Sequence, residues 1–153
     1  MAQPGFDTPR MAYTQRPYEV SYYATHQWAD PPARMLTPVL IQALEQTGYW
    51  RAIVPMPTSV RGDHRVDIDQ LELVQIFLQK PSQVRIALRV QVVKLPEYLG
   101  LGTRLFDAAE AASTDDAYGG AVAANRVAER LVQEIAGWLS GCVSVGQGSG
   151  CSR

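Results

Sequence analysis

The sequence has no excess of positive charge and no long apolar run, and each absence excludes a class of protein. Fourteen Lys and Arg against fifteen Asp and Glu leave a formal net charge of −1. Nucleic-acid-binding proteins usually carry a basic excess, so we expect no nucleic-acid partner. No stretch approaches the roughly 20 apolar residues of a membrane-spanning helix. The first residues, Met1-Ala-Gln-Pro-Gly, lack the basic start and the hydrophobic segment of a secretory signal.

Cysteine and histidine are scarce as well. Cys142 and Cys151 do not form a C-x-x-C pair and have no histidine near them, so we predict no zinc site. In an oxidising compartment the two are a candidate disulfide, whereas free thiols are expected in the cytosol. We predict no metal ion and no cofactor.

Enzyme signatures are also missing. A nucleophile elbow needs G-x-S-x-G, and Gly146-Gln-Gly-Ser-Gly150 has glycine in place of the serine. Gly100-Leu-Gly-Thr-Arg104 lacks the third glycine of a dinucleotide loop and the Gly-Lys of a phosphate loop. One cluster has the residue types of a metal site but matches no known spacing: Asp63, His64, Asp67 and Asp69. We interpret it as a solvated turn entering a strand, with a metal-dependent hydrolase as the competing hypothesis, and predict no enzyme.

The length of the chain, 153 residues, predicts one domain. We expect a flexible lead-in over residues 1–9, a single α/β domain over residues 10–139, and a flexible tail rich in Gly and Ser over residues 140–153.

The clearest strand pattern lies between Leu71 and Leu95. Five apolar residues occupy every second position, with polar residues between most of them: Val84, Ile86, Leu88, Val90 and Val92. Such alternation puts one face on a core and the other nearer solvent. The preceding apolar run, Leu71–Leu78, and a short connection with Pro81 as its turn former complete a predicted antiparallel hairpin.

Two helices are expected. The first begins at Asp30-Pro31, with Asp30 as the predicted cap, and continues with apolar residues at helical spacing until Gly48 ends it. Pro38 falls inside this spacing and is predicted to face solvent; alternatively, the regular helix starts at Pro38, with Thr37 as its cap. The second helix begins at the polar run 113–116 and is predicted to end near Trp138.

Four further strands are predicted, over Arg10–Thr14, Tyr18–Ala24, Tyr49–Val54 and Arg104–Ala112. In the last of these alanine favours a helix, but its position after the hairpin favours a strand. The first strand-helix-strand unit predicts a parallel pair with a right-handed crossover, and the later strands predict an antiparallel meander. We therefore predict an α/β fold, a mixed β-sheet covered by two main helices.

Aromatic residues crowd into the first third of the chain. Tyrosine and tryptophan pair an apolar body with a polar group, which suits contacts with proteins or lipid head groups. We single out Tyr22, Tyr23 and Trp28 as candidate partner or lipid contacts. The alternative is that these side chains are half-buried at the boundary between helix and sheet.

Several of these segments together resemble a known family. They are Arg10-Met-Ala-Tyr13, Tyr18-Glu-Val-Ser-Tyr-Tyr-Ala24, Trp28-Ala-Asp-Pro-Pro-Ala-Arg-Met-Leu36 with the helix into Thr47-Gly-Tyr-Trp50, Asp67-Ile-Asp-Gln-Leu-Glu-Leu73, and the last helix up to Ile135-Ala-Gly-Trp-Leu139. Over about residues 10–139 the pattern is similar to the ABC-type transport auxiliary lipoproteins, the family of the PqiC (YmbA) proteins.

This resemblance implies a fold like the amino-terminal domain of TolB and a non-enzymatic role. It implies an exported lipoprotein, periplasmic and anchored to the bacterial outer membrane, that accompanies an MCE-domain transport protein. Such systems are implicated in moving phospholipid or other hydrophobic molecules between membranes. The sequence departs from the family in having no leader and no lipid-accepting cysteine near residue 1.

Two hypotheses of other kinds accompany this one. A stand-alone periplasmic module that binds a small ligand or lipid is the alternative function, and it predicts an apolar pocket between sheet and helix. An accessory domain that lines a route between membranes would also form a closed homo-oligomeric ring.

Overall fold

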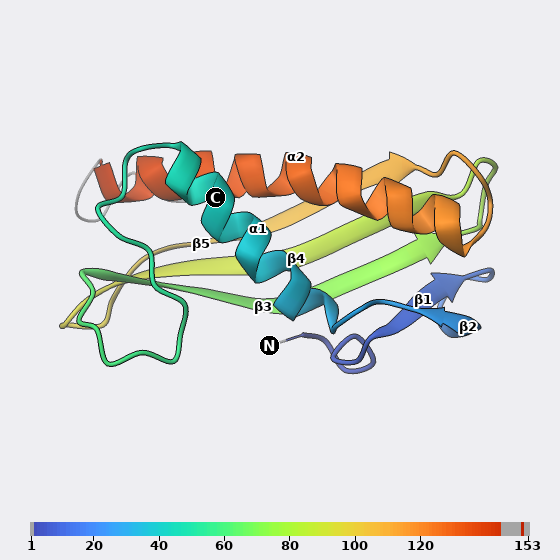
Figure 1. Cartoon of the computed structure of the whole chain (residues 1–153), viewed down its shortest axis with the longest axis horizontal. Coiled ribbons are helices and arrows are strands. Elements are labelled where there is room, and N and C mark those ends of the chain that lie inside the picture. The colour runs from blue at the N-terminus through green and yellow to red at the C-terminus, as the bar shows by residue number, and fades with distance from the viewer. Residues whose placement is uncertain (1, 145–150, 152–153) are drawn as a thin grey trace.

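The computed structural model describes residues 2–144 and residue 151, and it has the predicted α/β architecture (Figure 1). The elements are β1 (Arg10–Thr14), β2 (Ser21–Gln27), α1 (Pro32–Gln46), β3 (His64–Ile76), β4 (Gln83–Lys94), β5 (Leu99–Ala111) and α2 (Ala117–Ser144). The five strands form one sheet in the order β2-β1-β3-β4-β5. Strands β1 and β3 are parallel, and the other neighbouring pairs are antiparallel.

The predicted hairpin is the centre of this sheet. Strands β3 and β4 pair from His64↔Lys94 to Ile76↔Gln83, with a bulge between Asp69 and Glu72. The alternating residues of β4 are buried at every second position, and Val90 and Val92 have no exposed surface. The sequence pattern therefore predicted correctly which face of β4 meets the core.

Both helices lie on that one face of the sheet (Figure 1). Helix α2 has 28 residues and buries Val127, Leu131, Ile135 and Leu139 against the alternating residues of β4. Helix α1 crosses beside it and contributes Leu36, Leu40 and Leu44 to the same core. The opposite face of β3, β4 and β5 carries no helix of the described residues.

Helix α1 differs from the prediction at its start. It begins at Pro32, with Pro38 inside the helix and exposed, so the alternative start at Pro38 is wrong. The predicted Asp30 cap does not form, because the N-cap residue is Pro31 and no side chain caps it. Asp30 instead forms an ion pair with Arg34 at 3.3 Å.

Other predicted elements differ as well, and the strand predicted over Tyr18–Ala24 is observed as β2, Ser21–Gln27. Tyr49–Val54 is not a strand, since the segment between α1 and β3 has no regular structure. The parallel partner of β1 is therefore β3, which lies further along the chain. Helix α2 does not end near Trp138 but continues to Ser144, because Leu139 and Cys142 still face the core.

The two ends of the predicted domain also have described contacts. In the predicted lead-in, Ala2 bridges to Leu71 of β3, and the backbone N–H of Gln3 donates to the Leu71 carbonyl at 3.1 Å. Of the predicted tail, residues 145–150, 152 and 153 lie outside the described residues.

Candidate functional site

The face of the sheet opposite the helices, which we call the open face, carries most of the paired charges of the domain. Because side chains alternate along a strand, the residues between the buried positions of β4 all point to this face. Neighbouring strands contribute the residues opposite them in register. The open face thus consists of Asp67 and Asp69 of β3, Arg85, Arg89 and Gln91 of β4, and Thr103, Leu105 and Asp107 of β5.

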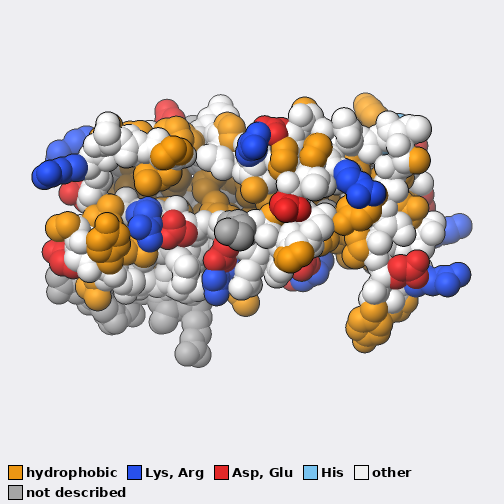
Figure 2. Space-filling model, turned by 90° about the horizontal axis from the view of Figure 1, so that it is seen from below, with side chains coloured by type: hydrophobic (Ala, Val, Ile, Leu, Met, Phe, Trp, Pro, Cys, Tyr) orange, Lys and Arg blue, Asp and Glu red, His pale blue; other side chains and the backbone are white. Residues whose placement is uncertain are grey.

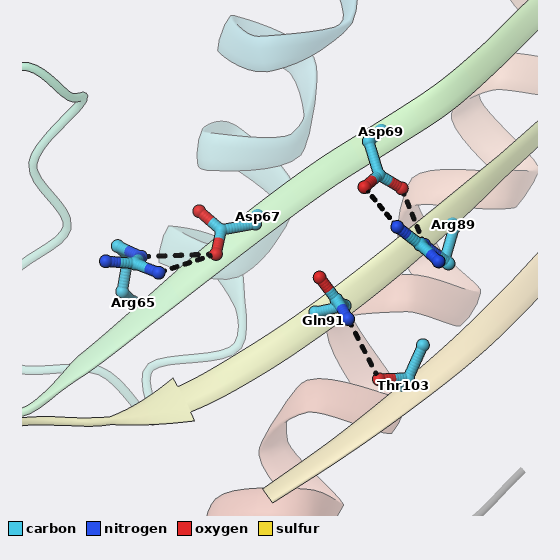
Figure 3. Close-up of polar contacts among 6 residues, drawn as sticks. All are labelled: Arg65, Asp67, Asp69, Arg89, Gln91 and Thr103. Carbon is cyan, nitrogen blue, oxygen red and sulfur yellow. Dashed lines mark hydrogen bonds and ion pairs between the residues drawn. The ribbon is translucent and has the colours of Figure 1, made fainter. Parts of the chain in front are cut away.

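Arginine-carboxylate pairs cross from strand to strand on this face (Figure 3). The Nε and Nη2 groups of Arg89 donate to the two oxygens of Asp69 at 2.7 and 2.5 Å. Arg85 makes the same two-pronged contact with Asp107, at 2.8 and 2.5 Å. Such bidentate pairs are stronger and more directional than single hydrogen bonds, so they fix the side chains in place.

Two weaker contacts extend the row. Arg65 Nε donates to Asp67 at 3.1 Å, and Gln91 donates to the Thr103 hydroxyl at 3.4 Å (Figure 3). Each described carboxylate of the open face therefore already has an arginine partner.

The ion pairs with arginine lower the pKa values of these carboxyl groups. Hydrogen bonds from Arg89 hold the pKa of Asp69 below its usual range, although partial burial opposes the shift. Arg85 lowers the pKa of Asp107 in the same way. Both carboxyls are ionised at neutral pH and neither is poised to exchange a proton there, as a general acid or base would be.

An open hollow of about 520 Å³ lies on this surface, lined by Gln70, Arg89, Thr103, Arg104 and Leu105. Gln70 has a φ of 55°, an uncommon backbone conformation for a residue with a side chain, and it lies in the bulge of β3. The bulge also brings Leu71 into the core, where it is 1% exposed. Leu105 is 70% exposed, so the hollow presents an apolar side chain beside paired charges.

The predicted cluster at the start of β3 does not assemble into one site. The ring of His64 packs near that of Trp50, with 6.5 Å between centroids, while Asp67 and Asp69 pair with arginines. In the part of the chain that the structure describes, no three or more His, Cys, Asp or Glu side chains come together as a metal-binding group. Chemically, the open face offers a fixed pattern of paired charges.

The predicted contact residue Tyr22 lies on the open side of the short strand β2. Its hydroxyl donates to the Gly5 carbonyl at 2.9 Å, and the Arg10 guanidinium lies 3.9 Å from the centre of its ring. The side chain thereby ties residues near the N-terminus to β2.

Tyr23, on the opposite face, belongs to a polar network at the start of α2. Its hydroxyl donates to Gln75 Oε1 at 2.7 Å, and Gln75 Nε2 donates to Ser82 Oγ at 3.0 Å and to the Asp116 carbonyl at 3.1 Å. Gln75 and Ser82 are buried. Burial raises the pKa of Tyr23 to about 12, with a further contribution from the negative charge of Asp116.

Gly120 of α2 lies against the same network. A Cβ atom there would collide with Gln75 Oε1, so any larger residue would displace the Gln75 amide from its hydrogen bonds. The network therefore fixes the first turns of α2 to β3.

Trp28 lies just after β2 and packs partly against the core. Its backbone N–H donates to the Pro9 carbonyl at 2.6 Å. Its indole Nε1 is buried and has no hydrogen-bond partner among the described residues. The structure thus gives Tyr22, Tyr23 and Trp28 contacts inside the domain, and it does not bring the three together on one surface; their role in partner contact stays a prediction.

The two cysteines are joined in the structure. Cys142 near the end of α2 forms a disulfide with Cys151, nine residues further on. Both side chains are buried, and they occupy the space beside Gly102 of β5 where a Cβ atom would collide with Cys151. The disulfide therefore connects the end of α2 to the sheet.

Sequence reasoning missed the acids that complete the open face. Asp107 and Glu72 both pair with Arg85, but they come from strands on either side of it and lie far from it in sequence. The available signal was the presence of Arg85 and Arg89 on the same face of one strand, since an opposite charge on a neighbouring strand stabilises such a side chain.

Comparison with family models gives one match. The model described as "ABC-type transport auxiliary lipoprotein component" matches residues 4–136, which confirms the resemblance found in the sequence. No curated protein matches the chain. No helix among the described residues is long and apolar enough to cross a membrane.

Solved structures support the fold. A Xanthomonas campestris protein of the DUF330 family has a TM-score of 0.86 at 22% identity, over 94% of this chain and 81% of that chain. An uncharacterised protein has a TM-score of 0.61 at 12% identity, over 95% of this chain and 86% of that one. The predicted mixed sheet with two helices is confirmed by these likenesses, which extend to the fold alone.

Proposed function

The chain belongs to the family of ABC-type transport auxiliary lipoprotein components, and we propose that it is a non-enzymatic accessory protein of an MCE-type transport system in a bacterial envelope. The observation that carries the proposal is the family match over residues 4–136. The protein would lie in the periplasm and be held to the outer membrane by an acyl chain. Its cargo would be phospholipid or another hydrophobic molecule passed between the two membranes.

The chemistry of the open face supports docking over catalysis. Asp69 and Asp107 are each held by two hydrogen bonds from an arginine, and the hydrogen bonds keep their pKa values low. Groups held in this way are suited to fixing the orientation of a partner through complementary charge. We propose that the MCE-domain protein docks on this surface.

A ring of copies is part of the proposal. The two edges of the sheet are the short strand β2 and the long strand β5. Because the two edges differ, a contact between β5 of one copy and β2 of the next would be head-to-tail, and head-to-tail contacts close into rings when the rotation allows. Native mass spectrometry that gives only monomer at high concentration would refute this part.

The alternative, a stand-alone module that binds a small ligand or lipid, predicts an apolar pocket between sheet and helices. The hollow found there, lined by residues that include Met11, Trp28 and Leu73, measures about 10 Å³. That is about the minimum space for one water molecule. The open hollow beside Leu105 is the larger of the two, but it lies on the other face.

The deciding experiment is the intact mass of the natural gene product, taken from the membrane fraction of its own host. A diacylglycerol-type modification at the N-terminus, together with co-purification of an MCE-domain protein, is the expected result. An unmodified chain in the soluble fraction with no such partner would overturn the proposal and favour the stand-alone module.

A further inference from the structure

Exposed apolar side chains gather at one end of the elongated domain. Six large apolar residues there have much of their surface exposed: Tyr49, Val54, Met56, Val60, Tyr98 and Leu99. They come from the segment 48–63 between α1 and β3 and from the connection between β4 and β5. We call this surface the apolar end; Figure 2 shows apolar side chains at its left, with basic and acidic side chains among them.

The two segments are neighbours in space. The backbone N–H of Leu95 donates to the Asp63 carbonyl at 2.8 Å, and the Arg65 guanidinium lies 5.6 Å from the centre of the Tyr98 ring. Figure 1 places the loop and the β4–β5 turn at the same end. The apolar end is thus built from two loops that lie side by side at one end of the domain.

The base of this surface is packed while its tip is exposed. Trp50 and Ile53 pack against the core, which anchors the segment 48–63. Met56 and Val60, further along the segment, are 65% and 60% exposed. A structureless connection of this length is uncommon in a compact domain unless it has a function.

The tip lies between two arginines, although the two loops together carry as many acidic as basic residues. Residues 49–61 contain Arg51 and Arg61 and no acidic residue. Outside them, the two loops carry the acids Asp63 and Glu97, Lys94 lies opposite His64 in register, and Arg65 is paired with Asp67. Apolar tips flanked by tyrosine, tryptophan and arginine are the residue types that enter the interface of a phospholipid bilayer.

We propose that the apolar end binds the surface of an anionic phospholipid bilayer, with Met56 and Val60 among the acyl chains and Arg51 and Arg61 at the phosphates. This inference rests on the proposed function, since a lipoprotein holds its domain within reach of a membrane. A second copy fits this surface less well, because two apolar ends face to face would bring the arginines of both copies together.

The test is co-sedimentation of the 153-residue chain, without an acyl group, with vesicles of phosphatidylglycerol and phosphatidylethanolamine. We expect the wild-type chain to bind and Met56→Asp with Val60→Asp to weaken binding at least tenfold, since each apolar side chain loses its burial. Changing Arg51 and Arg61 to Gln should weaken binding about fivefold for each arginine on these vesicles. On neutral phosphatidylcholine vesicles the arginine variants should bind like the wild type.

The matched control is Leu78→Asp, which changes an apolar side chain of similar exposure, 54%, in the β3–β4 turn at the opposite end. It should bind like the wild type, and circular dichroism should show all variants folded. Equal binding by the Met56→Asp, Val60→Asp variant, or no binding by the wild type, would overturn the inference.

Light scattering separates a contact between copies from a membrane contact. If the wild type does not bind vesicles and the aspartate variant changes the oligomeric state, the apolar end is an interface between copies and the inference is wrong. The two proposals can fail separately. If the natural gene product carries an acyl chain and co-purifies with its partner, but the 153-residue chain does not bind vesicles, this inference is wrong and the proposed function stands.

Discussion

Replacing the buried Gln75 by Leu should markedly lower the temperature at which the domain unfolds. Gln75 is 3% exposed and makes three hydrogen bonds, with the Tyr23 hydroxyl, the Ser82 hydroxyl and the Asp116 carbonyl. Leucine has a similar volume but no polar group. All three partners would lose a hydrogen bond, and the Ser82 hydroxyl, which is fully buried, could not turn to water.

The magnitude follows from this count. A hydrogen bond contributes about 1 kcal/mol net, and a buried polar group left without a partner costs about 1–3 kcal/mol. The apolar side chain of leucine recovers part of that loss, so we expect the free energy of unfolding to fall by about 2–4 kcal/mol. For a domain of this size the midpoint of thermal unfolding should fall by about 5–15 °C.

Circular dichroism during thermal and urea unfolding measures both quantities. The matched control is Gln91→Leu, which removes a half-buried glutamine whose bond to Thr103 is long, at 3.4 Å. We expect it to change the free energy of unfolding by less than about 0.5 kcal/mol. If Gln75→Leu is as stable as Gln91→Leu, the network does not hold α2 to the sheet and the reasoning is wrong.

Three further predictions concern other residues of the candidate site. Trp28→Ala should lower the free energy of unfolding by about 2–3 kcal/mol in urea, because its side chain is partly buried against the core. Between pH 10 and about 12 the domain should lose stability, because Tyr23 ionises in the unfolded chain near its usual pKa of 10 but keeps its proton in the folded chain up to a pKa of about 12. Arg89→Met should raise the pKa of Asp69 toward its usual range, which carbon-detected NMR titration measures. The Asp69–Arg89 pair adds stability above a pH of about 3.9 that is lost as the pH falls through the lowered pKa, so the variant should also unfold less steeply in acid.

Each has an outcome that contradicts it. A Trp28→Ala variant that keeps full stability and loses partner binding would contradict the structural role and support Trp28 as a contact residue. An alkaline transition unchanged in Tyr23→Phe would mean that another group causes it. An Asp69 pKa that does not move when Arg89 is replaced would show that the pair does not persist in solution.

The strands of the central hairpin could be predicted because their signal is local. In β4 the alternation of Val84 to Val92 reports directly which side chains are buried. Strand β5 was predicted correctly against the helix preference of its alanines, because a meander leaves a vacant edge beside β4. In both cases the neighbouring strand in sequence is also the neighbour in space.

Where pairing is distant, the same reasoning failed. Tyr49–Val54 has the residue types of a strand, but the place beside β3 is taken by β1, more than fifty residues earlier in the chain. Similarly, the segment rich in Gly and Ser from residue 140 led us to predict the end of α2 near Trp138, whereas the packing of Leu139 and Cys142 against the sheet extends the helix to Ser144.

The candidate site was only partly visible for the same reason. The shared side of Asp67 and Asp69 follows from their spacing, but the partner of Asp69 depends on the register between β3 and β4. The bulge at Gln70 shifts that register, and no local pattern in the sequence marks it.

The attachment near the N-terminus affects how the domain would respond to force. Strand β1 runs parallel to β3, and Ala2 and Gln3 are bonded to Leu71 of the same strand. A pull on this end, directed along β1, would stretch the backbone hydrogen bonds between the two strands in shear, all at once. Hydrogen bonds that are loaded together withstand a larger force than hydrogen bonds that break one after another. A tether at this end would therefore load β1 and β3 in shear and would not separate them one hydrogen bond at a time.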